Sequence, residues 1–142
     1  ARHCTNMLEA PSLYGDLMDD MRRSASRILR DLEHKMDIEG GDALLQLKPR
    51  ARIDLLLFYQ ECLINIIRHS GATSAHTRLS AADGQIHLTV SDNGCGLAAG
   101  EIPASLKRRA RLLGASVDAG TTGSKGARIQ LRLKIRRFAL FK

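Results

Sequence analysis

Apolar residues recur at helical spacing in two long stretches of the chain. The first runs from residue 8 to residue 32 and places charged residues between its apolar positions, as an amphipathic helix does. The second runs from Arg52 to His69, is more strongly apolar, and follows Pro49, a residue that helices accept in their first turn. We predict a helix over each stretch. The apolar positions of the first helix are Leu13, Leu17, Met21, Ile28, Leu29 and Leu32.

Two short strands are predicted between these helices. Residues 34–39 alternate polar with apolar side chains, which is typical of a strand. Gly40 and Gly41 then break the pattern, as a turn would. A second strand is predicted at residues 44–47.

A β-hairpin is predicted after the central helix. Apolar residues alternate in residues 77–80 and again in residues 86–90. Between them lies Asp83-Gly84, a dipeptide that favours tight hairpin turns. The two strands should therefore pair antiparallel.

The C-terminal third predicts one helix and two more strands. Residues 104–113 form a basic helix that Gly114 would cap. A short strand begins at Val117, and residues 127–135 alternate as a strand with one polar face. This mixed order predicts an α/β fold, a two-layer sandwich in which helices pack on one face of a mixed sheet.

Length and composition place the chain among single globular domains. Its 142 residues match the roughly 100 to 200 residues of one domain, and 44% hydrophobic residues suffice for an ordinary core. No apolar run approaches the roughly 18 residues of a membrane span. The chain begins with Ala1 rather than Met and shows no secretory signal, which predicts a fragment of a longer protein. Three cysteines without a CxxC pair and five histidines without ligand spacing predict a reducing, cytoplasmic setting and no zinc or haem.

The positive charge gathers at the C-terminal end. The net charge is +7, and no acidic residue follows Asp118. Nucleic-acid modules usually add stacking aromatic side chains or a recognition helix, but the chain has only two Tyr and three Phe residues. We interpret the bases as a solvated strand and tail, and we do not expect a nucleic-acid partner.

Polar residues interrupt the central helix along one stripe. Steps of four and three place Glu61, Asn65, Arg68 and His69 on the same face. Such a stripe, facing a glycine-rich loop, suits a hydrated Mg²⁺ and a phosphate chain, because magnesium prefers oxygen ligands and keeps several waters. The alternative is that the stripe is only the solvent side of an amphipathic helix.

A glycine-rich loop, Asp92-Asn93-Gly94-Cys95-Gly96, follows the predicted hairpin. Gly94 and Gly96 permit positive φ and a close approach of the backbone to a ligand. Asp92 can accept a hydrogen bond from an exocyclic amine, which would select adenine over guanine. The alternative is an ordinary glycine turn.

A second glycine-rich loop, residues 120–126, precedes the last strand. It would approach phosphates through backbone N–H groups and Lys125. It is not a Walker loop, because GKS or GKT is absent, and its alternative is a plain hairpin loop. Cys62 is interpreted as a small apolar helix residue. Cys95 is not proposed as a nucleophile, because the sequence places no base beside it.

In combination, these segments resemble a known family. Residues 61–72 closely resemble the N box of the sensor histidine kinases of the NarX/DesK type, within the GHKL ATPase superfamily. Residues 92–97 resemble their G1 box. Residues 109–114 and 125–131 resemble the helix and closing strand of the family. The resemblance extends in order over roughly residues 30–135.

The resemblance implies a Bergerat-type sandwich that holds ATP between its helices and a flexible lid. Asn65 would then bind Mg²⁺, Glu61 would orient or activate the attacking group, and Asp92 would hold the adenine amine. Gly94 and Gly96 would let the backbone approach the nucleotide. The rest of the implied site consists of Arg68 and His69 near the phosphates, with Lys125 and Gly126 among the nucleotide-binding residues.

The resemblance also implies a function and its partners. The chain would be the ATP-binding catalytic domain of a bacterial sensor histidine kinase, which supplies the γ-phosphoryl of Mg-ATP to a histidine on an adjacent dimerisation domain. A response regulator and, in the full-length protein, a second copy would be further partners. Residues 1–32 would be the linker or tail of the dimerisation helix, residues 33–135 the ATP-binding domain, and residues 136–142 a basic tail. The implied location is the cytoplasm, and any membrane link of the parent sensor would come from its other parts.

Two segments depart from the family pattern. Residues 97–105 are several residues shorter than the usual lid, and Ser124-Lys125-Gly126-Ala127 stands where Gly-x-Gly-Thr is expected. The residues that the resemblance implies for binding adenine and magnesium are present, whereas the lid that would cover the phosphates is shortened. The alternative function is therefore a degenerate ATPase-fold module that binds a protein partner.

Overall fold

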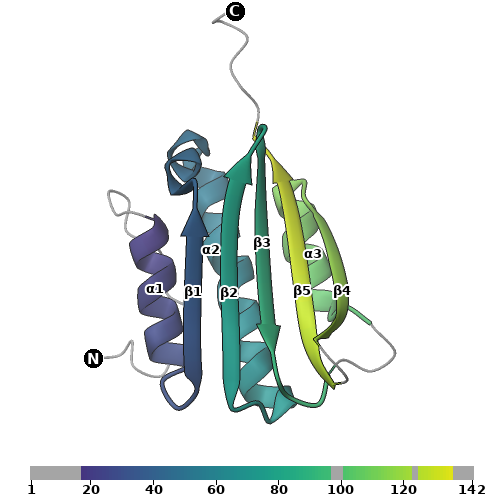
Figure 1. The fold of residues 1–142 in the computed structure, drawn as a ribbon. Helices are drawn as coiled ribbons and strands as arrows, with labels where there is room; N and C mark the ends of the chain where they lie inside the picture. Colours follow the sequence, from purple (N-terminus) through teal and green to yellow (C-terminus); the bar gives the residue numbers. More distant parts are fainter. Residues whose placement is uncertain (1–16, 97–100, 123–124, 136–142) are drawn as a thin grey trace, which may run out of the picture.

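The computed structural model describes residues 17–96, 101–122 and 125–135. These residues form one mixed sheet and the helices that cover one of its faces (Figure 1). The elements in chain order are α1 (Leu17–Ile28), β1 (Glu33–Glu39), η2 (Gly41–Gln46), α2 (Pro49–Asn65), η3 (Ile66–Ser70), β2 (Ser74–Ala82), β3 (Gln85–Asp92), α3 (Ala104–Leu113), β4 (Ser116–Thr122) and β5 (Lys125–Lys134).

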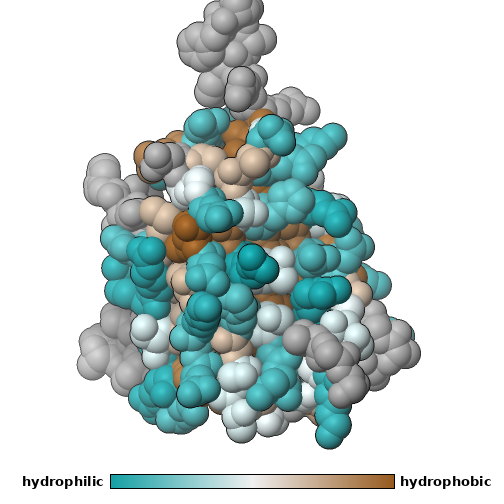
Figure 2. All heavy atoms as spheres, viewed as in Figure 1, coloured by the Kyte–Doolittle hydropathy of each residue, from teal (hydrophilic) through white to brown (hydrophobic). Residues whose placement is uncertain are grey.

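The sheet has the strand order β1-β2-β3-β5-β4. β1 pairs with β2 in parallel, and the other neighbouring strands pair antiparallel. In Figure 1, α2 and α3 lie behind the sheet, and the face toward the viewer carries mostly hydrophilic residues (Figure 2). The predicted two-layer α/β sandwich with a mixed sheet is therefore confirmed.

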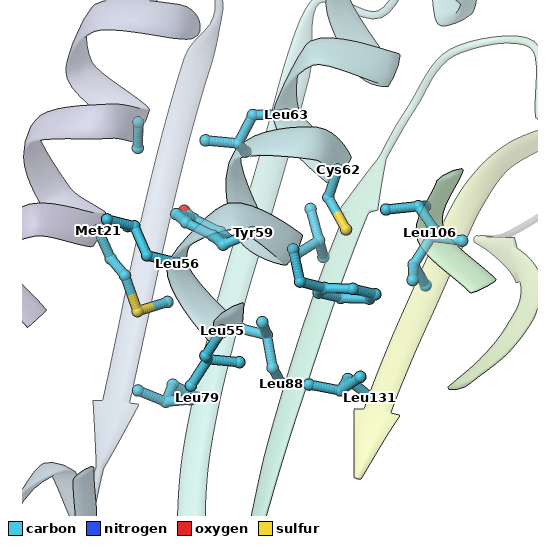
Figure 3. Packing of buried hydrophobic residues seen from close by; sticks show 14 of the residues in the cluster. Met21, Leu55, Leu56, Tyr59, Cys62, Leu63, Leu79, Leu88, Leu106 and Leu131 are labelled. Atoms are coloured by element: carbon cyan, nitrogen blue, oxygen red, sulfur yellow. The ribbon is translucent and has the colours of Figure 1, made fainter. Parts of the chain in front are cut away.

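The core lies between the sheet and the helices. Strand residues alternate, so that Ile86 and Leu88 of β3 are buried while His87 between them is exposed. Side chains from α1, α2 and α3 meet the inward residues of the strands (Figure 3). The core residues with the least exposure include Met21, Leu55, Phe58, Tyr59, Leu63, Ile86, Leu88 and Leu131.

The helix α1 packs into this same core. Met21 has no exposed surface, and Gln60 Nε2 of α2 donates a hydrogen bond to Ser24 Oγ at 2.9 Å. The described part of the predicted first helix thus belongs to the sandwich, while residues 8–16 lie outside the described part of the chain. That residues 1–32 are the tail of a dimerisation helix stays a prediction. No helix among the described residues is long and apolar enough to cross a membrane.

The strand predicted at residues 44–47 is wrong, because these residues lie in and just after the 3-10 helix η2. The N–H of Ala43 donates to the carbonyl of Gly40 at 3.0 Å, and the N–H of Leu47 donates to the carbonyl of Leu44 at 3.2 Å. Both bonds span three residues, as in a 3-10 turn. Leu44 and Leu47 are buried whereas Leu45 is 68% exposed, so the apolar spacing was three rather than two.

The other predicted elements are present in the described part of the chain, although the first helix ends at Ile28 rather than at Leu32. The hairpin turns at Asp83 and Gly84, which both have positive φ, as a tight hairpin turn of the favoured type requires. The basic helix spans Ala104–Leu113 and ends at Gly114, whose φ is 71°. The central helix is α-helical to Asn65 and continues as the π-helical turn η3.

A network of two hydrogen bonds that share Thr77 joins three elements of the fold. Tyr59 of α2 has no exposed surface, and its hydroxyl lies 2.7 Å from Thr77 Oγ1 on β2. The same Oγ1 lies 3.0 Å from His34 Nε2 on β1. Burial, with a smaller contribution from the nearby His76, lowers the pKa of His34. A neutral His34 ring can accept from Thr77, which leaves the Tyr59 hydroxyl free to donate to Thr77.

We expect Thr77→Val to lower the free energy of unfolding by about 1–3 kcal/mol, because it leaves the buried Tyr59 hydroxyl without its partner. Urea denaturation measures this change. Thr89→Val, on the hydrophilic face of the sheet, is the matched control and should stay within about 0.5 kcal/mol of wild type. Equal stability of both variants would show that the hydrogen bonds of Thr77 contribute nothing to the stability of the fold.

Candidate functional site

A cavity of about 190 Å³ lies where α2 and β3 end and α3 begins. In Figure 1, α2 and β3 both end in the lower part of the molecule. The cavity is apolar over most of its wall and polar at a few points. Its lining residues are Cys62, Asn65, Ile66, His69, Val90, Asp92, Gly96, Pro103, Leu106, Ala127 and Ile129.

Asp92 is the acidic residue of the cavity wall. It ends β3, is only 6% exposed, and accepts the N–H of Gly94 on Oδ1 at 2.7 Å. Burial raises the pKa of Asp92, and hydrogen bonds from the backbone N–H groups of Gly94 and Ala127 oppose this shift. No cation of the described residues forms an ion pair with it.

The raised pKa of Asp92 means that its charged form costs the fold stability. The folded state holds the proton more tightly than the unfolded chain does. This carboxyl therefore stabilises the fold below its unfolded pKa, and the contribution is lost as the pH rises through its folded pKa. Asp92 is buried at the cavity although burial disfavours its charged form, which favours a role in binding over a role in stability.

The glycines of the loop after β3 hold two backbone segments together. The N–H of Gly126 donates to the carbonyl of Gly94 at 2.8 Å. Gly96 has a φ of 86°, and a Cβ at this position would lie 3.0 Å from the carbonyl oxygen of Gly126. Gly94 does not adopt positive φ. Close packing of the loop against β5, which the sequence did not reveal, thus requires a glycine at position 96.

Asn93 is a structural residue of this region that the sequence analysis left without a role. Its Oδ1 accepts the N–H groups of Thr73 at 2.9 Å and Ser74 at 3.0 Å. Its Nδ2 donates to Thr73 Oγ1 at 2.9 Å. Asn93 therefore fastens the glycine loop to the segment that follows η3. Short amide side chains commonly bind backbone groups, but these partners lie 19 and 20 residues away along the chain, so no local sequence pattern identifies them.

Two residues of the predicted stripe on the central helix reach the cavity. Asn65 lines it, and its buried Nδ2 has no hydrogen-bond partner among the described residues. His69 also lines it and is exposed, within the π-helical turn η3. The thiol of Cys95 donates to the carbonyl of His69 at 3.3 Å, so the glycine loop also contacts this turn.

The remaining predicted charged residues lie outside the cavity wall. Glu61 is one helical turn before Asn65, and its Oε2 accepts the hydroxyl of Ser105 on α3 at 3.3 Å. Arg68 and Lys125 are exposed. The structure thus brings Asn65 and His69 together with the glycine loop, and it leaves these three at the periphery.

The residues of the cavity fit a metal ion that arrives with a phosphate chain. No group of three or more His, Cys, Asp or Glu side chains able to hold a metal is found in the part of the chain that the structure describes. Asn65 instead presents an amide side chain in the cavity wall, and its oxygen is the kind of ligand that Mg²⁺ prefers, whereas its unpartnered Nδ2 is a hydrogen-bond donor. Mg²⁺ in nucleotide sites is commonly held by one or two protein groups together with substrate phosphates.

Comparison with known families assigns the chain to a class. Residues 51–137 match the family of histidine kinase-, DNA gyrase B- and HSP90-like ATPases, and the chain belongs to this family. The predicted membership of the ATPase superfamily is therefore confirmed, whereas the NarX/DesK type stays a prediction.

Individual relatives agree with this class. The sensor histidine kinase LiaS of Bacillus subtilis (strain 168) is 26% identical over 126 residues, which are 84% of this chain and 32% of that protein. The chain thus spans about a third of the length of this relative.

Two solved structures share the fold. The ATP binding domain of PrrB from Mycobacterium tuberculosis has a TM-score of 0.65 at 23% identity, over 86% of this chain and 93% of that one. The histidine kinase domain of the blue-light activated histidine kinase EL346 from Erythrobacter litoralis has a TM-score of 0.66 at 19% identity, over 90% and 65%. At this level of identity, both similarities show a shared fold.

We expect Gly96→Ala to weaken ATP binding about tenfold or more, because the added methyl group pushes the glycine loop away from the Gly126 carbonyl. Isothermal calorimetry measures the affinity. Gly114→Ala is the matched control, since Gly114 also has positive φ but a Cβ there meets nothing within 4 Å. Both variants share the cost of a left-handed residue, about 1–2 kcal/mol of stability. Equal ATP affinity in the two variants would contradict the role given to the loop contact.

Proposed function

We propose that this chain is the ATP-binding catalytic domain of a bacterial sensor histidine kinase. It supplies the γ-phosphoryl of Mg-ATP to a histidine on an adjacent dimerisation domain. The observation that carries the proposal is the buried carboxylate of Asp92, which has no cation beside it in the described structure and lies in a mostly apolar cavity. Membership of the ATPase family and the similarity to LiaS support it.

The apolar part of the cavity suits a planar base. Val90, Leu106 and Ile129 offer flat contacts, and burial of apolar area is favourable there. Asp92 accepts a hydrogen bond from the exocyclic amine of adenine. Guanine carries an oxygen at that position, and two acceptors facing each other are repulsive. The domain therefore selects ATP over GTP.

The polar end of the cavity suits the phosphates. Mg²⁺, held by Asn65 together with the phosphate oxygens, would neutralise charge on the transferred group. His69 in the wall and the exposed Arg68 and Lys125 add donors for the phosphate chain. Glu61 orients or activates the attacking group. Phosphoryl transfer then depends mainly on holding the donor and the acceptor in line.

The acceptor belongs to another domain of the same protein. His69 lies in the cavity wall, so it cannot line up with the γ-phosphate from the far side. A second copy of the full-length protein joins through the dimerisation domain, and a response regulator receives the phosphoryl group afterwards. We place the domain in the cytoplasm, where ATP is available.

We expect Asp92→Asn to weaken ATP binding by about 1–3 kcal/mol, because an amide offers a donor where the carboxylate offered an acceptor to the adenine amine. Calorimetry with ATP and with GTP measures the effect. The wild-type chain should prefer ATP, and the variant should lose most of this preference. Asp118→Asn, an exposed position on β4, is the control. Equal affinities of the wild type for ATP and GTP would contradict the adenine assignment.

We expect the chain alone to bind Mg-ATP but to incorporate no acid-labile label from γ-labelled ATP. Adding a separate fragment that carries the acceptor histidine of the parent protein should produce label on that fragment. Labelling of this chain by itself, mapped to His3 or His34, would show that the acceptor was assigned to the wrong domain.

A further inference from the structure

A side-chain contact between α2 and α3 lies just outside the cavity wall. Ser105, the second residue of α3, donates its hydroxyl to Glu61 Oε2 at 3.3 Å. Both residues are half-buried. The next residue of α3, Leu106, lines the cavity, and so does Cys62, which follows Glu61 on α2. The contact therefore joins the two helices at the rim of the site.

The hydrogen bond from Ser105 fixes the orientation of the Glu61 side chain. In the described part of the chain, no other side-chain hydrogen bond or ion pair involves its carboxylate. A glutamate side chain has several rotatable bonds, and fixing them costs conformational entropy unless a partner stabilises one arrangement. Without the Ser105 hydroxyl, the carboxylate would sample several orientations.

The same stripe of α3 carries a second polar group. Arg109 lies one turn after Ser105, and its Nε is buried without a hydrogen-bond partner among the described residues. The neighbouring buried residues of α3, Leu106 and Ala110, are apolar. Of these residues on α3, Ser105 is the one whose polar side chain forms a hydrogen bond with a side chain of α2.

We infer that Ser105 is a positioning residue for phosphoryl transfer, because its hydroxyl holds the Glu61 carboxylate in one orientation. The inference rests on the proposed function, in which Glu61 orients or activates the attacking group. The bond does not touch the base end of the cavity around Asp92. Its loss therefore lowers the transfer rate and leaves nucleotide affinity almost unchanged.

The test measures both quantities in the full chain. Transfer from γ-labelled Mg-ATP to the separate acceptor fragment gives the rate, and calorimetry gives the ATP affinity. We expect Ser105→Ala to lower the rate about tenfold, as a hydrogen bond to a charged group allows, with ATP affinity within about twofold of wild type. Ser105→Thr keeps the hydroxyl and should restore most of the rate. Ser116→Ala, at an exposed position on β4, should change neither quantity.

A double-mutant cycle identifies the path of the effect. In a Glu61→Ala background, Ser105→Ala should cause no further loss of rate, because the carboxylate that it positions is gone. An undiminished loss in that background, an unchanged rate in Ser105→Ala, or equal loss of rate and affinity would overturn the inference. If the wild-type chain binds Mg-ATP but never labels the fragment, the proposed function fails, and the inference fails with it.

Discussion

A buried carboxylate that pairs with no cation among the described residues organises the functional edge of this sandwich. Asp92 ends a central strand, and the backbone N–H groups of Gly94 and Ala127 favour its charged form against burial. The same loop then bonds to β5 through Gly94 and Gly126. The end of β3, the glycine loop and the start of β5 are therefore fixed by one small set of backbone contacts. A ligand that donates a hydrogen bond to Asp92 compensates for part of the cost of burying it.

The central helix α2 supplies the rigid side of the site. It packs between α1 and α3, its last residue Asn65 lines the cavity, and the following turn η3 presents His69 to the same cavity. Its polar residues face different surroundings, since Asn65 lines the cavity while Glu61 contacts α3. One helix thus contributes to the cavity wall and to the junction with α3. In the proposed function, this division separates the residues that bind the nucleotide from those that assist phosphoryl transfer, because the two tasks need different groups.

Periodicity predicted most of the fold because its elements are long and half-buried, so that their apolar residues repeat at the spacing of helix or strand. The failure at residues 44–47 arose where a short apolar run had a spacing of three. The sequence also placed Asn65, Asp92 and Gly96 in one site, and all three line the cavity. It could not reveal the partners of Asn93 or Ser105, which lie 20 and 44 residues away along the chain.

An NMR titration of the ¹⁵N-labelled chain with Mg-ATP tests directly whether an adenine nucleotide binds in the cavity at the ends of α2 and β3. We expect saturable shifts of the backbone amides of His69, Gly94 and Ala127, and none at Thr89 or Arg132 on the hydrophilic face of the sheet. Shifts confined to that face, or no saturable shifts at all, would show that the nucleotide does not bind in this cavity.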